Sequence, residues 1–183
     1  MNENTFPNHQ ENSNGPGLEW ISPETRLGVV HKVNLNELAR TRPLHVRLMA
    51  GYVNSFIMSL PSEVSSPHKW LDLYNKYQNK RRGHSKPDQF NKLILNMINN
   101  GFEKSYPIPV DSKYCILDGA HRFAACLAIG IDPYVQIYNA KSHDIEESWV
   151  INNDFSPDEV KIIRPGLHSF GYLAYPSEMK FWI

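Results

Sequence analysis

Residues 116–130 hold the densest chemical information in this chain of 183 residues. An apolar run ends at Asp118-Gly119, the basic pair His121-Arg122 follows, and the next residues are rich in alanine. Glycine lets the backbone approach an anion closely, and the first N–H groups of a helix have no acceptor within that helix. Arginine can bind two phosphate oxygens at once. The residue types and their spacing therefore favour a phosphate site at this turn.

The same pattern has a plainer interpretation. Asp-Gly between a strand and a helix is a common turn, and a His-Arg pair in a first helical turn is often only solvated surface. Asp118 could also cap the helix by accepting a hydrogen bond from an N–H two or three residues on, which is worth about 1 kcal/mol. The spacing alone leaves both interpretations open.

At Asp118-Gly119-Ala120-His121-Arg122, which we call the basic box, the chain resembles the ParB/sulfiredoxin superfamily. Its members hold nucleotide phosphates with a strand, a glycine-led basic box and a helix. The resemblance extends upstream, where an amphipathic pattern over 90–98 ends at Asn100-Gly101 and Tyr106-Pro-Ile-Pro-Val110 leads toward a second strand. It covers roughly residues 86–138. It implies an α/β (α+β) protein of ParB/sulfiredoxin-like fold, with a small mixed sheet, surrounding helices and a helical insertion.

Differences from individual branches narrow the implied chemistry. ParB partition proteins carry Gly-Glu-Arg-Arg and sulfiredoxins carry Gly-Cys-His-Arg, whereas Ala120 replaces that glutamate or cysteine here. These differences argue against a CTP switch and against sulfinic acid reduction. The free serine kinases of the superfamily carry an Asp-Gly-x-x-Arg box, which is similar to residues 118–122. The resemblance therefore implies phosphoryl transfer from ATP or ADP, with Mg²⁺, to a hydroxyl of a small molecule such as a sugar, a polyol or an amino acid.

A kinase of this kind needs groups that bind the nucleotide phosphates, a group that binds the metal ion and a group that accepts the hydroxyl proton. The residues expected to bind the nucleotide are Gly119, Ala120, His121, Arg122, Ser85 and Lys86. Asp118, at the strand end, is expected to hold Mg²⁺ or to accept the hydroxyl proton, and His121 to stabilise charge on the transferred group. Glu37 and Glu103 are further candidates for the base.

Two functions from other classes stay open. The first is a ParB-like, nucleotide-binding regulator associated with DNA, and the second is a nucleotidase or nuclease in which the box orients water. Lys plus Arg equals Asp plus Glu at 19 each, so the chain has no net charge to attract a polyanion. No helix-turn-helix pattern is evident after the box, and nucleic acid is therefore not expected as a partner.

A second basic cluster precedes Pro87, a residue suited to a first helical turn. It comprises Lys80, Arg81, Arg82, His84 and Lys86. Charge runs are usually solvated loops. The alternative is a lid that closes on the phosphates, with Ser85 and Lys86 as its candidates, and the insertion at about 40–85 would then form the substrate-facing wall.

Hydrophobic periodicity, together with the residues that start and end helices and strands, predicts the remaining elements. Strands are expected over 26–33 and 133–138, and a turn or short helix over 34–38. Helices are expected over 44–60, from Ser66-Pro67 through Tyr77, over the Ala-rich segment that ends at Gly130, and from Ser156-Pro157 to 163.

We expect residues 1–17 to form a disordered tail, because they hold few apolar side chains, and residues 18–183 to form a single domain. Cys115 and Cys126 have the character of core thiols rather than of a disulfide or catalytic pair. The aromatic segment over 170–182 is typical of core cover or a protein contact. The sequence shows no leader or membrane-spanning pattern, and we therefore expect a cytoplasmic protein with no membrane partner. Whether it forms a homo-oligomer is left open.

Overall fold

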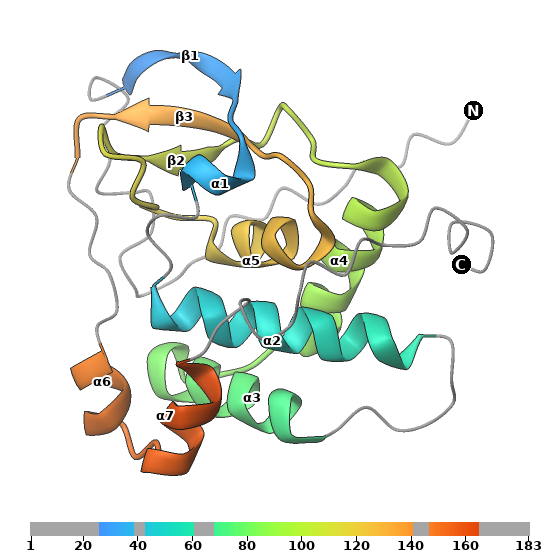
Figure 1. Cartoon of the computed structure of the whole chain (residues 1–183), viewed down its shortest axis with the longest axis vertical. Helices are drawn as coiled ribbons and strands as arrows, with labels where there is room; N and C mark the ends of the chain where they lie inside the picture. The colour runs from blue at the N-terminus through green and yellow to red at the C-terminus, as the bar shows by residue number, and fades with distance from the viewer. Residues whose placement is uncertain (1–25, 39–42, 61–67, 141–146, 165–183) are drawn as a thin grey trace.

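The computed structural model describes residues 26–38, 43–60, 68–140 and 147–164. Within them, three strands form a mixed sheet in the order β1-β3-β2. β1 (Arg26–Lys32) runs antiparallel to β3 (Tyr134–Tyr138), and β2 (Ile108–Val110) runs parallel to β3. The sheet lies at one end of the molecule and the longer helices lie to one side of it (Figure 1). The expected α+β class with a small mixed sheet is confirmed.

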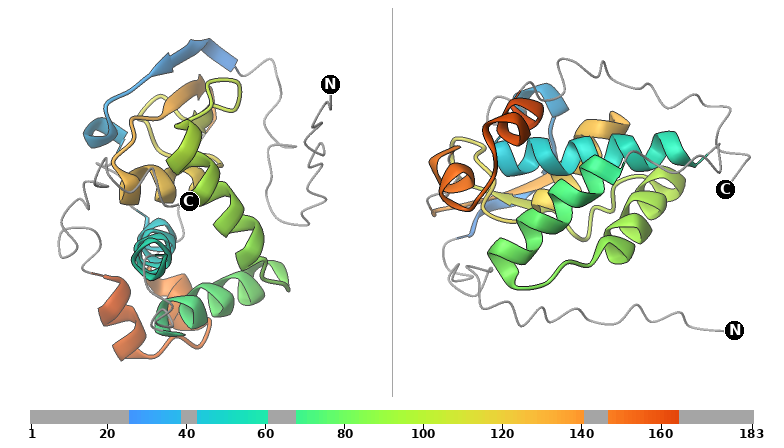
Figure 2. Two further views of the ribbon diagram at one scale, coloured as in Figure 1. Left: turned by 90° about the vertical axis from the view of Figure 1, so that its right-hand side faces the viewer. Right: turned by 90° about the horizontal axis from the view of Figure 1, so that it is seen from below.

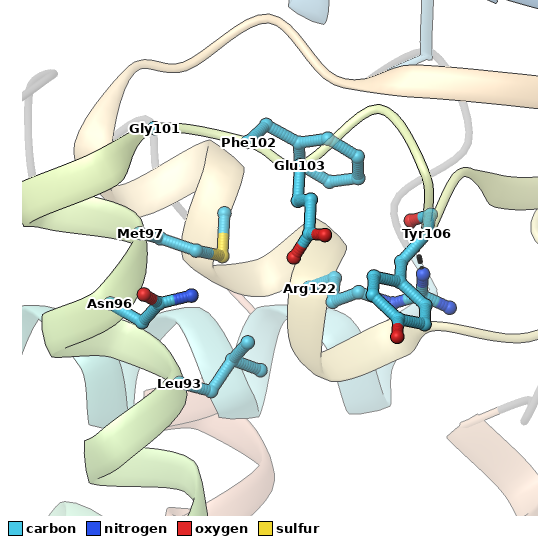
Figure 3. A pocket seen from close by; sticks show the side chains of 8 residues that line it. All are labelled: Leu93, Asn96, Met97, Gly101, Phe102, Glu103, Tyr106 and Arg122. Carbon is cyan, nitrogen blue, oxygen red and sulfur yellow. Dashed lines mark hydrogen bonds between the residues drawn. The ribbon is translucent and has the colours of Figure 1, made fainter. Parts of the chain in front are cut away.

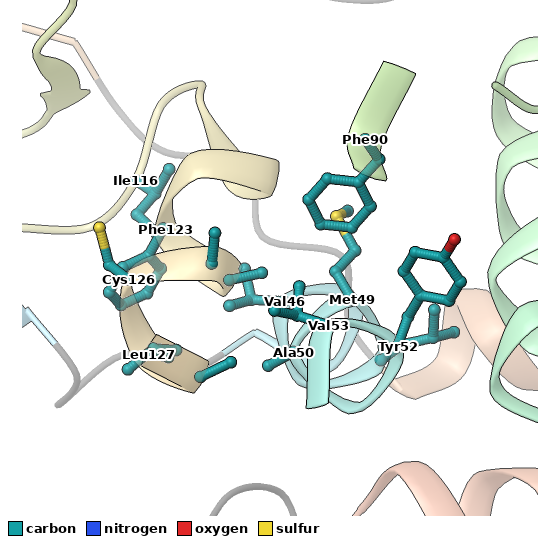
Figure 4. Packing of buried hydrophobic residues seen from close by; sticks show 14 of the residues in the cluster. Val46, Met49, Ala50, Tyr52, Val53, Phe90, Ile116, Phe123, Cys126 and Leu127 are labelled. Atoms are coloured by element: carbon teal, nitrogen blue, oxygen red, sulfur yellow. The ribbon is translucent and has the colours of Figure 1, made fainter. Parts of the chain in front are cut away.

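Two apolar helices form the centre of the core. α5 (Ala120–Ile129) is buried at every position from Phe123 to Ile129, and α2 (Leu44–Ser59) is buried along most of its length. A helix that is apolar on all sides belongs inside a protein. The two helices pack through side chains such as Val46, Ala50 and Leu127 (Figure 4).

The helices after α2 connect this core to the box. Seen end-on, α2 lies between α5 on one side and α3 (His68–Arg82) on the other (Figure 2). α2 and α3 both belong to the segment expected as an insertion. α2 lies in the core, and α3 is the helix of that segment that reaches the basic box.

α4 (Pro87–Asn100) follows the sequence pattern closely. Proline occupies its first turn, and the chain leaves it through Gly101, which has a φ of 77°. Its buried side chains are Phe90, Ile94, Met97 and Ile98. They recur at the spacing of one helix face, which packs toward α5.

The strand expected directly before the box is reduced to a single bridge between Val110 and Ile116. The cause is the aspartate that follows β2. The Asp111 carboxylate accepts hydrogen bonds from the N–H groups of Lys113 and Cys115, at 2.8 and 2.9 Å. A side chain that binds nearby backbone donors competes with ladder pairing, and the result is a tight turn over 111–115 rather than a second strand.

Short helices complete the described part of the chain. They are α1 (Leu35–Leu38), α6 (Glu147–Asn152) and α7 (Pro157–Ile163), of which α6 was not predicted. The predicted capping box of α7 is present, because the Ser156 hydroxyl accepts from the Glu159 N–H while the Glu159 carboxylate accepts from the Ser156 N–H. Of the helices in the described ranges, none combines the length and apolarity needed to cross a bilayer. The predicted tail, Ser66-Pro67 and the aromatic segment over 170–182 lie outside these ranges.

Candidate functional site

The basic box forms the start of α5. Gly119 has a φ of 81°, in the left-handed region that favours glycine, and it occupies the position just before the helix. The first helical bond runs from the Phe123 N–H to the Gly119 carbonyl at 2.9 Å. The N–H groups of residues 120–122 precede this bond and have no acceptor inside the helix. This is the backbone arrangement that the box predicts, with half-buried Asp118 just before Gly119.

The Arg122 side chain folds back over Gly119. Its Nη1 donates hydrogen bonds to the backbone carbonyls of Tyr106 and Pro107, the second at 3.1 Å. A Cβ at position 119 would lie only 2.9 Å from Nη2 of Arg122. Arg122 therefore holds the loop before β2 against the box, a tethering role that the sequence did not predict.

His121 faces the helices rather than the amides of the box. Its Nε2 lies 3.1 Å from the Tyr74 hydroxyl oxygen and 3.3 Å from the Gln78 amide nitrogen, and its ring meets Phe90 edge-on at 4.6 Å between centroids. With the amide nitrogen of Gln78 as donor, Nε2 accepts and the ring proton is on Nδ1. His121 thus bridges α3, α4 and α5.

Burial and positive neighbours keep this histidine neutral. Burial is the larger cause, and the charges of Arg82, Arg81 and Arg122 add to it, so the pKa of His121 falls to about 3. A neutral ring adds no positive charge to a phosphate site. The predicted role of His121, to stabilise charge on the transferred group, would therefore have to come from hydrogen bonding rather than from a positive charge.

The arginines whose charges act on His121 come from two helices. Arg81 and Arg82 are in the last turn of α3, and Arg122 is in the first turn of α5. The guanidinium of Arg81 donates to the Tyr77 hydroxyl at 2.6 Å and lies over the same ring. The interpretation of residues 80–82 as a loop is wrong, because they continue α3, where cations are favourable near the helix C-terminus.

The other candidates from the second basic cluster lie at the start of α4. The Ser85 hydroxyl donates to the side-chain oxygen of Asn75 at 2.6 Å, and so faces α3. Lys86 is exposed, immediately before the first turn of α4. That turn lies beside the box, because it carries Phe90 to His121.

The two candidate glutamates have different positions. Glu103 lies in the loop between α4 and β2 and lines a pocket together with Arg122 (Figure 3). Glu37 is on α1, whose first N–H, from Leu35, donates to the Asp132 carboxylate at 2.9 Å. Asp132 lies in the turn after α5, whereas the box lies before that helix, so this contact attaches the start of α1 at the far end of α5 from the box.

The metal prediction names one carboxylate, that of Asp118. Among the residues the structure describes, no three His, Cys, Asp or Glu side chains gather in a way that could hold a metal ion. Asp118 is the carboxylate of the box itself. Mg²⁺ is often held by one or two carboxylates together with substrate phosphates. The residues fit a magnesium ion that arrives with a nucleotide better than a resident metal.

Tyr74 and Gln78 are the site residues that sequence reasoning missed. They are four residues apart on α3, so helical periodicity places them on one face. That periodicity says nothing of what the face meets, which here is His121.

The chain matches no protein-family model, no curated protein and no solved structure. The resemblance to the ParB/sulfiredoxin superfamily therefore rests on the residues of the box and on the order of the elements around it.

Proposed function

We propose that the basic box and the last turn of α3 bind the phosphates of a nucleotide, and that the protein is a nucleotide-dependent phosphotransferase of ParB/sulfiredoxin-like fold. One observation carries this proposal: the charges of Arg81 and Arg82 in the last turn of α3 and of Arg122 in the first turn of α5 all act on His121, at the start of α5. Three neighbouring cations repel one another, and a polyphosphate would replace that repulsion with attraction. The helix amides and the positive end of the helix dipole add to the attraction.

In this proposal, phosphate binding, loop positioning and metal binding fall to different residues. The amides of residues 120–122 and the arginines of α3 bind the phosphates, while Arg122 keeps the neighbouring loop in place. Asp118 holds the Mg²⁺ that accompanies ATP or ADP, and this ion supplies charge neutralisation on the phosphates. The acceptor is a hydroxyl of a small molecule, of the sugar, polyol or amino acid type.

The order of elements supports the proposed fold. The α4 helix, Gly101, β2, the bridge at Ile116, the glycine-led box, α5 and β3 follow one another as in the superfamily resemblance. The parallel pairing of β2 with β3 places α5 as the crossover between them.

Calorimetric titration with Mg·ATP and Mg·ADP tests the proposal. Arg82→Gln removes one cation near the box, and Lys69→Gln, at the exposed start of α3, removes the same charge away from it. We expect Arg82→Gln to weaken nucleotide binding by about tenfold or more, since hydrogen bonds to charged groups contribute about 1.5–3 kcal/mol. Lys69→Gln should bind like the unchanged protein. Equal affinities for the two variants, or no nucleotide binding at all, would contradict the proposal.

A product assay separates transfer from hydrolysis. The protein is mixed with Mg·ATP or Mg·ADP and a set of small polyols, and mass spectrometry follows products heavier by one phosphoryl group. Such a product supports the phosphotransferase. Phosphate release without an acceptor would replace it with a nucleotidase.

A further inference from the structure

A pocket lies directly beside the box, between the second half of α4 and the loop over 101–107 (Figure 3). Apolar surface comes from Met97, Phe102 and Tyr106. Asn96, Glu103 and Arg122 provide polar groups on its wall. Apolar walls with a few placed polar groups are typical of small-molecule sites.

Arg122 belongs to both the pocket and the box. Its guanidinium lines the pocket, and its Nη2 would lie 2.9 Å from a Cβ at position 119. A phosphate at the first turn of α5 and a small molecule in the pocket would therefore be neighbours, on the two sides of one side chain.

We propose that this pocket binds the acceptor of the phosphoryl group, that the acceptor is a monosaccharide or a cyclic polyol, and that Glu103 accepts its proton. This inference rests on the proposed function, and it adds the place and the chemical class of the acceptor.

The wall chemistry fits a sugar ring. Such a ring has an apolar face of C–H groups and a rim of hydroxyls, so it needs an aromatic surface beside donors and acceptors. The Tyr106 ring is 61% exposed, and the half-buried Phe102 ring lies nearby in the same wall. The Asn96 amide, the Glu103 carboxylate and the Arg122 guanidinium can each bind a hydroxyl.

Two of these polar groups are held in place before any ligand arrives. The side-chain oxygen of Asn96 accepts from the Asn100 amide at 2.6 Å. The Glu103 carboxylate accepts from the Ser105 hydroxyl at 2.5 Å. Groups fixed in this way lose less conformational freedom when they bind.

The transfer step balances with these residues. The acceptor oxygen forms a bond to the terminal phosphorus as the bond from that phosphorus to the oxygen of the leaving nucleotide breaks. The acceptor proton passes to the Glu103 carboxylate. The leaving group is ADP when the donor is ATP, and AMP when it is ADP.

Amide NMR spectra of the full chain test where the acceptor binds. D-glucose, D-ribose and myo-inositol are each titrated into ¹⁵N-labelled protein saturated with Mg·ADP. We expect at least one of them to shift signals from residues 93–106. Asn96→Ala should abolish these shifts, whereas Asn99→Ala, an exposed neighbour on the same helix outside the pocket, should leave them unchanged.

Kinetics test Glu103. With Mg·ATP and the sugar that binds, Glu103→Gln should lower kcat at least tenfold and leave nucleotide affinity unchanged, while Asp72→Asn on the exposed side of α3 should change neither.

The two proposals fail in different ways. Nucleotide shifts at residues 119–122 without any sugar shifts at 93–106 would overturn the acceptor pocket and leave the nucleotide site standing. Sugar shifts at 93–106 without nucleotide binding would overturn the phosphotransferase. Full activity in both Asn96→Ala and Glu103→Gln would overturn the assignment of the pocket.

Discussion

The Tyr74 hydroxyl oxygen lies 3.1 Å from Nε2 of His121, and this contact joins α3 to the first turn of α5. The Tyr74 ring also stacks on Tyr52 of α2 at 4.8 Å and lies 5.4 Å from Phe90 of α4. Side chains of α3 and α4 therefore meet at the neutral imidazole of α5, and Tyr52 of α2 packs against them. The position of the α3 arginines relative to the box depends on this meeting point.

Tyr74→Phe should loosen that connection without emptying the core. The phenylalanine ring keeps the stacking on Tyr52 and Phe90 but loses the bond to His121. We expect the free energy of unfolding, measured with urea, to fall by about 1 kcal/mol. Tyr134→Phe on β3, a second loss of a tyrosine hydroxyl, serves as the control. Equal stabilities of the two variants would show that the Tyr74–His121 bond contributes nothing.

The free energy of unfolding should depend on pH because of His45 and His121. The pKa of His45 is lowered from 6.5 to about 3 by burial and then by Arg81 and His121, and that of His121 is lowered to about 3 by burial and then by the three arginines. At pH values between about 3 and 6.5, these two histidines bind protons in the unfolded chain but not in the folded chain. The free energy of unfolding should therefore decrease as pH falls from about 6.5 toward 3, by up to about 1.4 kcal/mol per pH unit for each histidine.

Urea unfolding at a series of pH values checks this dependence. His45→Phe keeps a flat ring beside Tyr77, on which His45 stacks at 6.1 Å, and it should reduce the slope between pH 6.5 and 4 by about one proton. His121→Gln should do the same. A profile that is flat in this range, or a slope that neither substitution reduces, would show that these side chains are not neutral in the folded protein.

The sequence predicted the features that local physics determines. Pro87 begins α4, Gly130 ends α5 in the left-handed conformation, and Ser156 caps α7. Each of these depends on the dihedral freedom or hydrogen-bonding groups of a few neighbouring residues. The same reasoning located the turn at Gly119, and with it the backbone of the candidate site.

Features set by distant contacts were not predictable in this way. The carboxylate of Asp111 captures backbone donors that a second strand would have used, and no periodicity reveals that choice. The inward orientation of His121 depends on Tyr74 and Gln78, more than 40 residues earlier in the chain. The pattern identified the basic residues, whereas only the contacts of α3 with the first turn of α5 show which of them lie near one another.

Gly51 allows α2 and α3 to approach, and enlarging it should destabilise the core. A Cβ at this position would lie 2.3 Å from a ring atom of Trp70. Alanine favours a helix over glycine by about 1 kcal/mol, but overpacking costs about 1–3 kcal/mol, so Gly51→Ala should show a net loss in urea unfolding. In a Trp70→Leu background the same change should become neutral or stabilising. An equal effect in both backgrounds would exclude the contact with Trp70 as the cause.

Gly119 and Gly130 form a matched pair that separates backbone strain from a specific collision. Both have a left-handed φ, 81° and 80°, so alanine at either position should cost about 1–2 kcal/mol in urea unfolding. Nothing lies within 4 Å of a Cβ at position 130, whereas a Cβ at position 119 meets the Arg122 guanidinium. We therefore expect Gly119→Ala to cost more than Gly130→Ala, and to release the loop that Arg122 binds through the Tyr106 and Pro107 carbonyls. Amide exchange of residues 103–106 should accelerate only in Gly119→Ala, and combining Gly119→Ala with Arg122→Ala should bring the extra cost of Gly119→Ala close to zero. Identical behaviour of the two glycine variants would mean that Arg122 does not hold this loop against the box.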